Sequence, residues 1–337
     1  MRRPSGRPPS VASPSLCPQV FSFLEAVLEE VLDLFPSRHI HVGGDECPKD
    51  AWAACPKCQA RIKSEGLADE GELQSWFLRR VAAWLRARGR RLVGWDEILE
   101  GGLPEDATVM SWRGIGGGVR AAELGHEVIM SPATHTYLDY RQGTAAHEPG
   151  AWYAMLPLEA TYMFDPVPTY DMYLPVLPGW ADTAAMREWR ATTYPESAAA
   201  SLTEATAAKI IGAQANLWTE YVSSQTQVEY MLLPRLCAFA EAVWSPSTQR
   251  HWPSFQARLP TLLGLFDSLG VNYRPLDATE GSPIPEDVDM PKVHSTPDLL
   301  QGGRFSAPVD GAYIAQRMSE GGSSNAIDPV SIPDHII

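Results

Sequence analysis

The chain has 337 residues, which is enough for one large domain or two smaller ones. Hydrophobic residues make up 45% and charged residues 20%, a balance typical of a globular protein with a buried core. The formal net charge of -14 would repel a phosphate backbone, so nucleic acid is not an expected partner. No stretch stays apolar for the length that a membrane span requires, so none is expected.

The two ends of the chain differ in composition from its middle. Residues 1–17 are rich in Pro, Ser and Arg and contain no secretory signal, so we expect a disordered or non-native leader there. Residues 275–337 are rich in Pro, Gly and acidic residues and have no Trp, which predicts a linker or the remnant of a further module. The sequence therefore predicts a folded region over residues 18–274 and leaves the cellular compartment undetermined.

Within this region, helical and strand-like spacings of apolar residues alternate. The apolar positions from Val20 to Phe35 predict an amphipathic helix, and His39–Val42 is typical of a short buried strand. Further strands are predicted at Arg91–Trp95, Thr108–Trp112, Glu127–Met130 and Lys209–Leu217. Further helices are predicted at Leu73–Leu85, Val119–Leu124 and Val228–Val243. This alternation favours an α/β fold with a parallel sheet.

Acidic and aromatic residues stand at the carboxyl ends of the predicted strands. In chain order they are Asp45, Glu46, Trp95, Trp112, Tyr137, Asp139, Trp218 and Glu220. In a parallel α/β barrel these strand ends share the face on which active sites are built. Indole rings stack on sugar rings and carboxylates bind hydroxyl groups, so the combination favours a carbohydrate ligand. For any single Trp, a place in the core is the alternative.

The acid pair Asp45-Glu46 follows Gly43 and Gly44, which permit an unusual backbone course and the close approach of a substrate. Two like charges so close do not both ionise easily, so one carboxyl would donate a proton while the other stays anionic. Cleavage of a glycosidic bond requires this division of roles. A helix cap or a surface acid pair is the alternative that spacing alone leaves open.

Two further motifs have structural interpretations. Asp96-Glu97 is a second acid pair, but it lacks preceding glycines, and we interpret it as the start of a helix or as charge behind the site. The run Gly114–Gly118 resembles a dinucleotide-binding fingerprint, yet Val119 occupies its last required position. We therefore expect no nucleotide cofactor.

The five cysteines form no evident disulfide framework, because their number is odd and two of them, Cys17 and Cys237, stand alone. Cys47, Cys55 and Cys58 crowd together and could contribute to a zinc site. A structural zinc ion needs four ligands, and a fourth is not evident nearby, so no metal is expected.

Five motifs in order carry a resemblance to a known family. They are Phe35-Pro-Ser-Arg-His-Ile-His-Val-Gly-Gly-Asp-Glu46, Gly94-Trp-Asp-Glu97, Ser111-Trp-Arg113, Tyr137-Leu-Asp139 and Asn216-Leu-Trp-Thr-Glu220. Together they resemble the family 20 glycoside hydrolases, the β-N-acetylhexosaminidases, over residues 16–273. The resemblance implies an α/β fold of the (β/α)8 TIM-barrel type, incomplete, with about strands four to eight present.

The resemblance also implies retaining hydrolysis of terminal β-linked N-acetylglucosamine or N-acetylgalactosamine by substrate-assisted catalysis. In such a reaction the substrate's acetamido oxygen attacks the anomeric carbon and forms an oxazolinium intermediate. By the family pattern Glu46 is the general acid/base, Asp45 orients the acetamido group, and Tyr137 donates a hydrogen bond to its carbonyl oxygen. The residues implied to bind the sugar are Trp95, Trp112, Asp139, Trp218 and Glu220. The scheme needs no metal and no cofactor.

The expected incompleteness of the barrel leaves alternatives for function. An arginine that grips the sugar hydroxyls belongs to the family's earlier strands, so we expect a fragment or an incompletely delimited reading frame. An inactive fragment or a carbohydrate-binding pseudoenzyme is the alternative, although a lectin would not need both Asp45 and Glu46. A retaining glycosidase with a carboxylate nucleophile is a third, favoured if activity did not require the acetamido group. The sugar configuration, the natural glycan and the oligomeric state stay undetermined.

Overall fold

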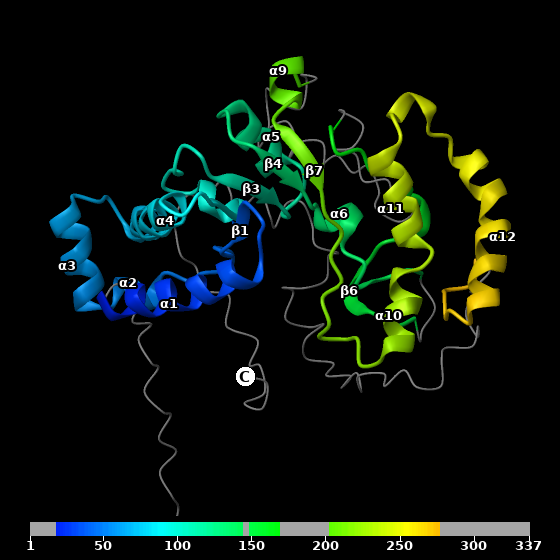
Figure 1. Cartoon of the computed structure of the whole chain (residues 1–337), viewed down its shortest axis with the longest axis horizontal. Helices are drawn as coiled ribbons and strands as arrows, with labels where there is room; N and C mark the ends of the chain where they lie inside the picture. Colours follow the sequence, from blue (N-terminus) through cyan, green and yellow to red (C-terminus); the bar gives the residue numbers. More distant parts are fainter. Residues whose placement is uncertain (1–17, 144–147, 169–201, 277–337) are drawn as a thin grey trace, which may run out of the picture. The chain divides into compact units, whose positions relative to one another are not determined.

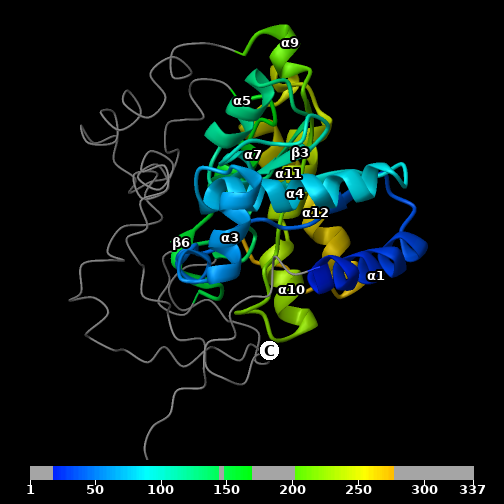
Figure 2. The same ribbon diagram turned by 90° about the vertical axis from the view of Figure 1, so that its left-hand side faces the viewer.

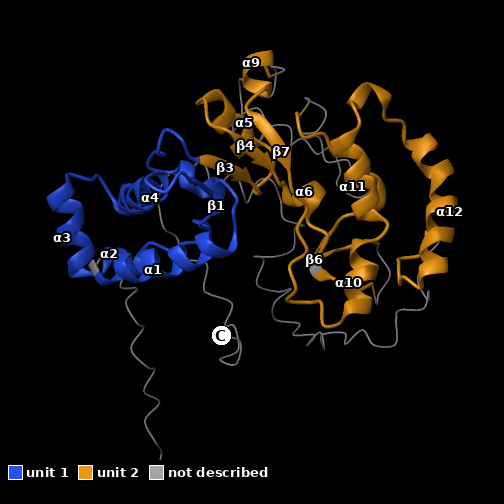
Figure 3. Ribbon diagram, viewed as in Figure 1, with its two compact units in different colours: residues 1–107, 320–337 blue, residues 108–319 orange. Residues whose placement is uncertain are grey.

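The computed structural model describes residues 18–143, 148–168 and 202–276, which are drawn in colour in Figure 1. The leader predicted at residues 1–17 and nearly all of the predicted acidic tail lie outside these residues. Two compact units divide the chain (Figure 3): the first comprises residues 1–107 and 320–337, and the second residues 108–319. No helix among the described residues combines the length and apolar character needed to cross a bilayer.

The first unit contains two parallel strands, β1 (His39–His41) and β2 (Arg91–Trp95), at the positions predicted from their apolar runs. In their register His39 pairs with Arg91, and His41 pairs with Val93. The helices of this unit are α1 (Pro18–Leu34), α2 (Asp50–Ala53), α3 (Pro56–Glu65) and α4 (Glu70–Arg86), with the short 3-10 helix η1 (Asp96–Leu99) after β2. The predicted helix at Leu73–Leu85 is therefore confirmed and begins earlier.

Helix α1 packs beside α4, as Figures 1 and 2 both show. The buried ring of Phe21 lies 5.1 Å from the ring of Phe77 and 5.8 Å from that of Trp76, measured between centroids. The guanidinium of Arg80 covers the same ring at 3.7 Å. Aromatic contacts of this kind add to the stabilisation that burial alone provides, and they join the two helices.

The second unit contains three parallel strands, β3 (Thr108–Ser111), β4 (Val128–Met130) and β7 (Ile210–Ala213), with β4 paired to both others. A small second sheet pairs β5 (Tyr140–Arg141) with β6 (Ala151–Met155). The helices are α5 (Gly116–Glu123), α6 (Ala133–Thr136), α7 (Leu158–Tyr162), α9 (Glu204–Ala207), α10 (Gln225–Leu232), α11 (Arg235–Trp244) and α12 (Trp252–Leu269), with the 3-10 turn η3 (Ser247–Gln249). The predicted strand positions and the α/β class are thus confirmed.

Prolines account for the main differences from the predicted elements. The single helix predicted at Val228–Val243 is two helices, because Pro234 stands between them and lacks the N–H that a continuous helix requires. Helix α12 was not predicted, since its interior residue Pro260 argues against a helix. Phe255 and Leu259 of α12 are buried against α7 and α11, so tertiary packing outweighs the local penalty.

A buried arginine links separate segments of the second unit. Arg235 is 0% exposed. Its Nη1 donates to the carbonyl oxygens of Tyr140 and Leu156, both at 2.9 Å. Its Nη2 donates to the carbonyl oxygens of Leu138 and, at 2.7 Å, Met231. One guanidinium thereby satisfies main-chain acceptors before β5, in β5, after β6 and in α10.

Arg274, which follows α12, forms an ion pair with Glu148 of the same unit. The Nε atom of Arg274 lies 2.7 Å from one carboxylate oxygen of Glu148, and its Nη2 lies 3.3 Å from the other. The side chains are 14% and 3% exposed, so the pair is shielded from water. The backbone N–H of Arg274 also donates to the carbonyl oxygen of Leu233.

We expect the replacement Arg235→Met to lower the free energy of unfolding by about 3 kcal/mol or more, because buried carbonyl groups lose their donor. The measurement is urea unfolding followed by circular dichroism. Arg258→Met is the control: the Arg258 side chain is 57% exposed, and loss of its ion pair with Glu241 should change the stability by less than about 1 kcal/mol. Equal effects of the two replacements would contradict the role given to Arg235.

Candidate active site

Two glycines turn the chain at the carboxyl end of β1. Gly43 and Gly44 have φ angles of 74° and 100°, in the left-handed region that favours glycine. A Cβ atom at Gly44 would lie 2.5 Å from Cγ2 of Ile98, which is too close for two carbon atoms. The carbonyl oxygen of Gly44 accepts a 2.8 Å hydrogen bond from Nε2 of Gln74 in α4. Backbone conformation and packing therefore both require glycine at this turn.

The predicted acid pair follows the turn, and both of its side chains are exposed. Glu46 has a φ angle of 43°, which residues with a side chain rarely adopt and which is often found at functional sites. Asp45 acts electrostatically on His41: desolvation lowers the pKa of His41, and the carboxylate opposes that lowering. The ring of His41 lies edge-on to Trp95 at 4.9 Å. The structure thus groups Asp45, His41 and Trp95.

Trp95 is buried in the core of the first unit. It is 8% exposed, at the end of β2, and its backbone N–H donates to the carbonyl oxygen of Gly43. The next residue, Asp96, is fully buried in the first turn of η1, in agreement with its interpretation as the start of a helix. Of the two acid pairs, only the one after β1 presents both carboxyl groups to solvent in the region that the structure describes.

In the second unit, aromatic rings gather around Tyr137. The ring of Trp112 stacks on Tyr137 with centroids 6.3 Å apart and an interplanar angle of 12°. Trp218 meets the same ring edge-on at 5.9 Å and is 39% exposed. A parallel bridge between Tyr137 and Asn216 brings these segments together, and the backbone N–H of Leu138 donates to the carbonyl oxygen of Asn216. The structure therefore groups Tyr137, which was predicted to be catalytic, with Trp112 and Trp218, which were predicted to bind the sugar.

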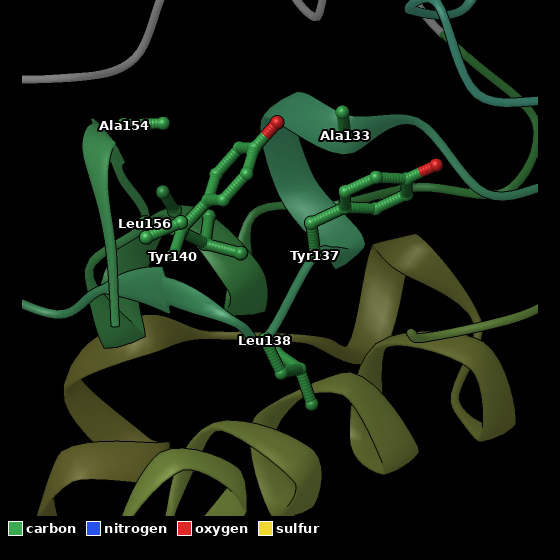
Figure 4. Close-up of a cluster of buried hydrophobic side chains, with 8 residues drawn as sticks. Ala133, Tyr137, Leu138, Tyr140, Ala154 and Leu156 are labelled. Carbon is green, nitrogen blue, oxygen red and sulfur yellow. The ribbon is translucent and has the colours of Figure 1, made fainter. Parts of the chain in front are cut away.

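Tyr137 is anchored in an apolar cluster (Figure 4). In the view of Figure 4, the rings of Tyr137 and Tyr140 lie on one side of the chain, and Leu138 points the other way, toward the helices below. Leu138 is 0% exposed, and the small residues Ala133 and Ala154 complete the cluster around the rings. Such packing limits the orientations that the Tyr137 ring can take.

Asp139 is a buried carboxyl group with an unsatisfied oxygen. It is 2% exposed, and desolvation raises its pKa to about 7, with Arg235 opposing the rise and Glu220 adding to it. Its Oδ1 atom accepts no hydrogen bond from any residue that the structure describes. Native structures rarely leave such an atom unpaired, so a hydroxyl group of a ligand or a water molecule is its natural partner. Glu220 is exposed nearby in electrostatic range.

A short network of polar side chains holds the segment that carries Trp218. The Nδ2 atom of Asn216 donates to the Oγ atom of Ser131 at 2.7 Å, and Nε2 of Gln214 donates to Oδ1 of Asn216 at 2.6 Å. Sequence reasoning did not identify Ser131 or Gln214 as part of the site. Nor did it identify Arg235, because a lone arginine in an amphipathic pattern is usually a surface residue.

The glycine-rich run after β3 has a packing role. The Oγ atom of Ser111 donates to the carbonyl oxygen of Gly114 and accepts from the N–H of Gly118, both at 2.8 Å. A Cβ atom at Gly118 would overlap with the Sδ atom of Met130. These glycines thus allow α5 to lie close to β3 and β4. Among the described residues, no group of three or more His, Cys, Asp or Glu side chains is arranged to hold a metal ion.

A family model described as "Glycosyl hydrolase family 20, catalytic domain" matches residues 5–247. The chain belongs to glycosyl hydrolase family 20. A β-hexosaminidase of Porphyromonas gingivalis is 41% identical over 255 residues, which are 75% of this chain and 29% of that protein. A β-hexosaminidase of Vibrio furnissii is 36% identical over 236 residues, which are 68% of this chain and 33% of that protein. The chain thus spans about a third of the length of these family 20 relatives.

Solved family 20 structures share the fold. The exo-β-N-acetylglucosaminidase of Vibrio harveyi, in complex with N-acetylglucosamine, superposes with a TM-score of 0.63 at 35% identity, covering 77% of this chain and 36% of that one. The chitobiase of Flavobacterium johnsoniae gives a TM-score of 0.58 at 27% identity, covering 76% and 33%. The fold is therefore an incomplete (β/α)8 barrel of the family 20 type, with about strands four to eight present.

The raised pKa of Asp139 predicts a pH dependence of stability. Between the ordinary pKa of 3.8 and about 7, the unfolded chain releases this proton while the folded chain keeps it, so stability should fall as pH rises through that window. We expect this fall in the free energy of unfolding to be about 2 to 4 kcal/mol, and Asp139→Asn should not show it. Urea unfolding between pH 4 and pH 8 measures the difference between the two proteins.

Asp106 is expected to contribute a pH dependence of stability opposite in direction to that of Asp139. A hydrogen bond from Arg86 lowers the pKa of Asp106, so its stabilising contribution should be present near neutral pH and decline on acidification. Asp106→Asn should therefore lose a small amount of stability at neutral pH. An unchanged pH profile in Asp139→Asn would contradict the raised pKa of Asp139, because it would mean that this carboxyl has the same pKa in the folded and the unfolded chain.

Proposed function

We propose that this chain serves the hydrolysis of terminal non-reducing β-linked N-acetyl-D-hexosamine residues, with retention of configuration and assistance from the substrate's acetamido group. The observation that carries the proposal is the buried Oδ1 atom of Asp139, which has no hydrogen-bond partner among the described residues and lies close to Trp218 of the aromatic group. A sugar presents the two features that such a place requires: an apolar ring face and hydroxyl groups at its edge.

The second unit supplies the residues proposed to bind the sugar. The partly exposed indole of Trp218 can stack on a pyranose ring, and Trp112 and Tyr137 extend this apolar surface. Asp139, with its pKa raised to about 7, exists near neutral pH in both protonation states and can donate to or accept from a hydroxyl. Glu220 adds an acceptor close to it.

The acid pair supplies the proposed chemistry. Glu46 protonates the glycosidic oxygen as the bond to the leaving sugar breaks, while the acetamido oxygen attacks the anomeric carbon from the opposite face. Asp45 offsets the positive charge that develops on the oxazolinium nitrogen, and the Tyr137 hydroxyl donates to the acetamido oxygen. Glu46 then removes a proton from the water that opens the intermediate, so configuration is retained. The strained backbone at Glu46 supports a functional role for this position.

Trp95 has a smaller proposed part in sugar contact, in view of its burial. The relatives support the substrate class: two similar proteins are named β-hexosaminidases, and the Vibrio harveyi enzyme is described in complex with N-acetylglucosamine. The same enzyme is described as inactive when one of its aspartates is replaced by alanine, which agrees with an essential anionic partner. Neither a metal nor a cofactor takes part in the proposed steps.

Glu46→Gln tests the proton donor. With a chromogenic β-N-acetylglucosaminide, we expect kcat to fall by about 10²-fold or more, because the leaving oxygen loses its acid. Binding of N-acetylglucosamine, followed by NMR titration, should persist because glutamine keeps the size of the side chain. Glu105→Gln replaces another exposed acid of the first unit and should leave both quantities unchanged.

The same assay separates the alternatives. Binding without any turnover by the unaltered chain would favour a carbohydrate-binding pseudoenzyme or an inactive fragment. Equal turnover of a β-glucoside that lacks the acetamido group would favour a carboxylate nucleophile and contradict substrate assistance.

Trp218→Ala tests the binding surface. Loss of an indole that stacks on a sugar should weaken binding of N-acetylglucosamine by about tenfold, or about 1.4 kcal/mol. The matched control is Trp244→Ala in α11 of the same unit, because Trp244 is 90% exposed and lies outside the aromatic group around Tyr137. Similar affinities for both variants would remove Trp218 from the proposed site.

A further inference from the structure

Three cysteines of the first unit meet in one apolar cluster that the proposed hydrolysis does not use. Cys58 is 2% exposed and is packed with Trp52 and Leu73. Cys47 and Cys55 are partly buried against the same cluster. Such a gathering of sulfur atoms in a short stretch of chain calls for a chemical explanation.

The backbone places Cys55 and Cys58 side by side. Cys55 is the N-cap residue of α3, with φ -87° and ψ 116°, and Cys58 lies in the first turn of that helix. Residues three positions apart face the same side of a helix. Both residues also pack in the same apolar cluster. The two side chains therefore lie close together, with the spacing of a Cys-x-x-Cys pair.

The two thiols differ in access and in acidity. The neighbouring Cys58 lowers the pKa of the Cys55 thiol, and the backbone and charge of Lys57 add to the lowering. Cys55 is also partly exposed, whereas Cys58 is buried. A thiolate is the nucleophile in disulfide exchange, so Cys55 can attack a reagent from solvent. Cys58 can reach the sulfur of Cys55 but hardly that of a dissolved molecule.

We propose that Cys55 and Cys58 form a redox site that exchanges with low-molecular-weight disulfides. The Cys55 thiolate attacks one sulfur of the disulfide RSSR, a Cys55–SR bond forms, and RS⁻ leaves. Cys58 then loses its proton and attacks the Cys55 sulfur, which forms the Cys55–Cys58 disulfide and releases the second RS⁻. Two electrons pass from the protein to the reagent, and the two released thiolates take up the two protons lost by the cysteines.

The test uses the full chain and oxidised glutathione as the disulfide. We expect peptide mass mapping to find a Cys55–Cys58 disulfide in the unaltered chain and, in Cys58→Ser, a stable glutathione adduct on Cys55. Cys55→Ser should show no adduct on Cys58. Cys237 is the internal control, because desolvation raises the pKa of its thiol. At pH 7 it should react at least about tenfold more slowly than Cys55.

Several results would overturn the proposal. They are a lasting glutathione adduct on Cys55 in the unaltered chain, a disulfide from Cys55 to Cys47 in place of Cys58, and reaction of Cys55 at the rate of Cys237. Protection of all three cysteines by added Zn²⁺ would also overturn it, in favour of a metal site. The experiment on the unaltered chain does not depend on the folding of any variant. The outcome is independent of the proposed glycosidase activity.

Discussion

The second unit depends on one buried cation. Arg235 donates to the carbonyl oxygens of Leu138 and Tyr140, and these two residues flank Asp139 on both sides. A third donation, to Leu156, holds the chain after β6 against the same point. The charge of the guanidinium also opposes the rise in the pKa of Asp139 that desolvation causes. Arg235 thus helps to position the candidate sugar-binding acid and limits the rise in its pKa.

The acids proposed to take part in the reaction differ in environment. Glu46 and Asp45 stand on a strained turn and are exposed to solvent. Asp139 is enclosed, and its proton is retained because the charged form is poorly solvated. An exposed acid suits repeated proton transfer, and an enclosed one suits directional hydrogen bonding to a hydroxyl. This contrast matches the roles proposed for the two places.

Five strands could be predicted from the sequence because each contains a short run of mostly apolar residues. All five predicted strand positions agree with the structure, whereas β5 and β6 were not predicted. Arg235 could not be predicted, since its acceptors lie up to 97 residues away and are main-chain atoms without any side-chain signal. The burial of Asp139 has the same cause: it depends on segments that only the tertiary fold brings near. Helix α12 escaped prediction because Pro260 breaks the local pattern that packing restores.

The ion pair between Glu148 and Arg274 has a consequence for shortened versions of the chain. Arg274 follows α12 in irregular backbone, where a helix-based boundary would invite trimming. Without Arg274, the buried carboxylate of Glu148, which is 3% exposed, would lose this cationic partner and would be poorly solvated by water. A shortened chain that ends at Gly270 is therefore expected to be less stable than one that ends four residues later, at Arg274.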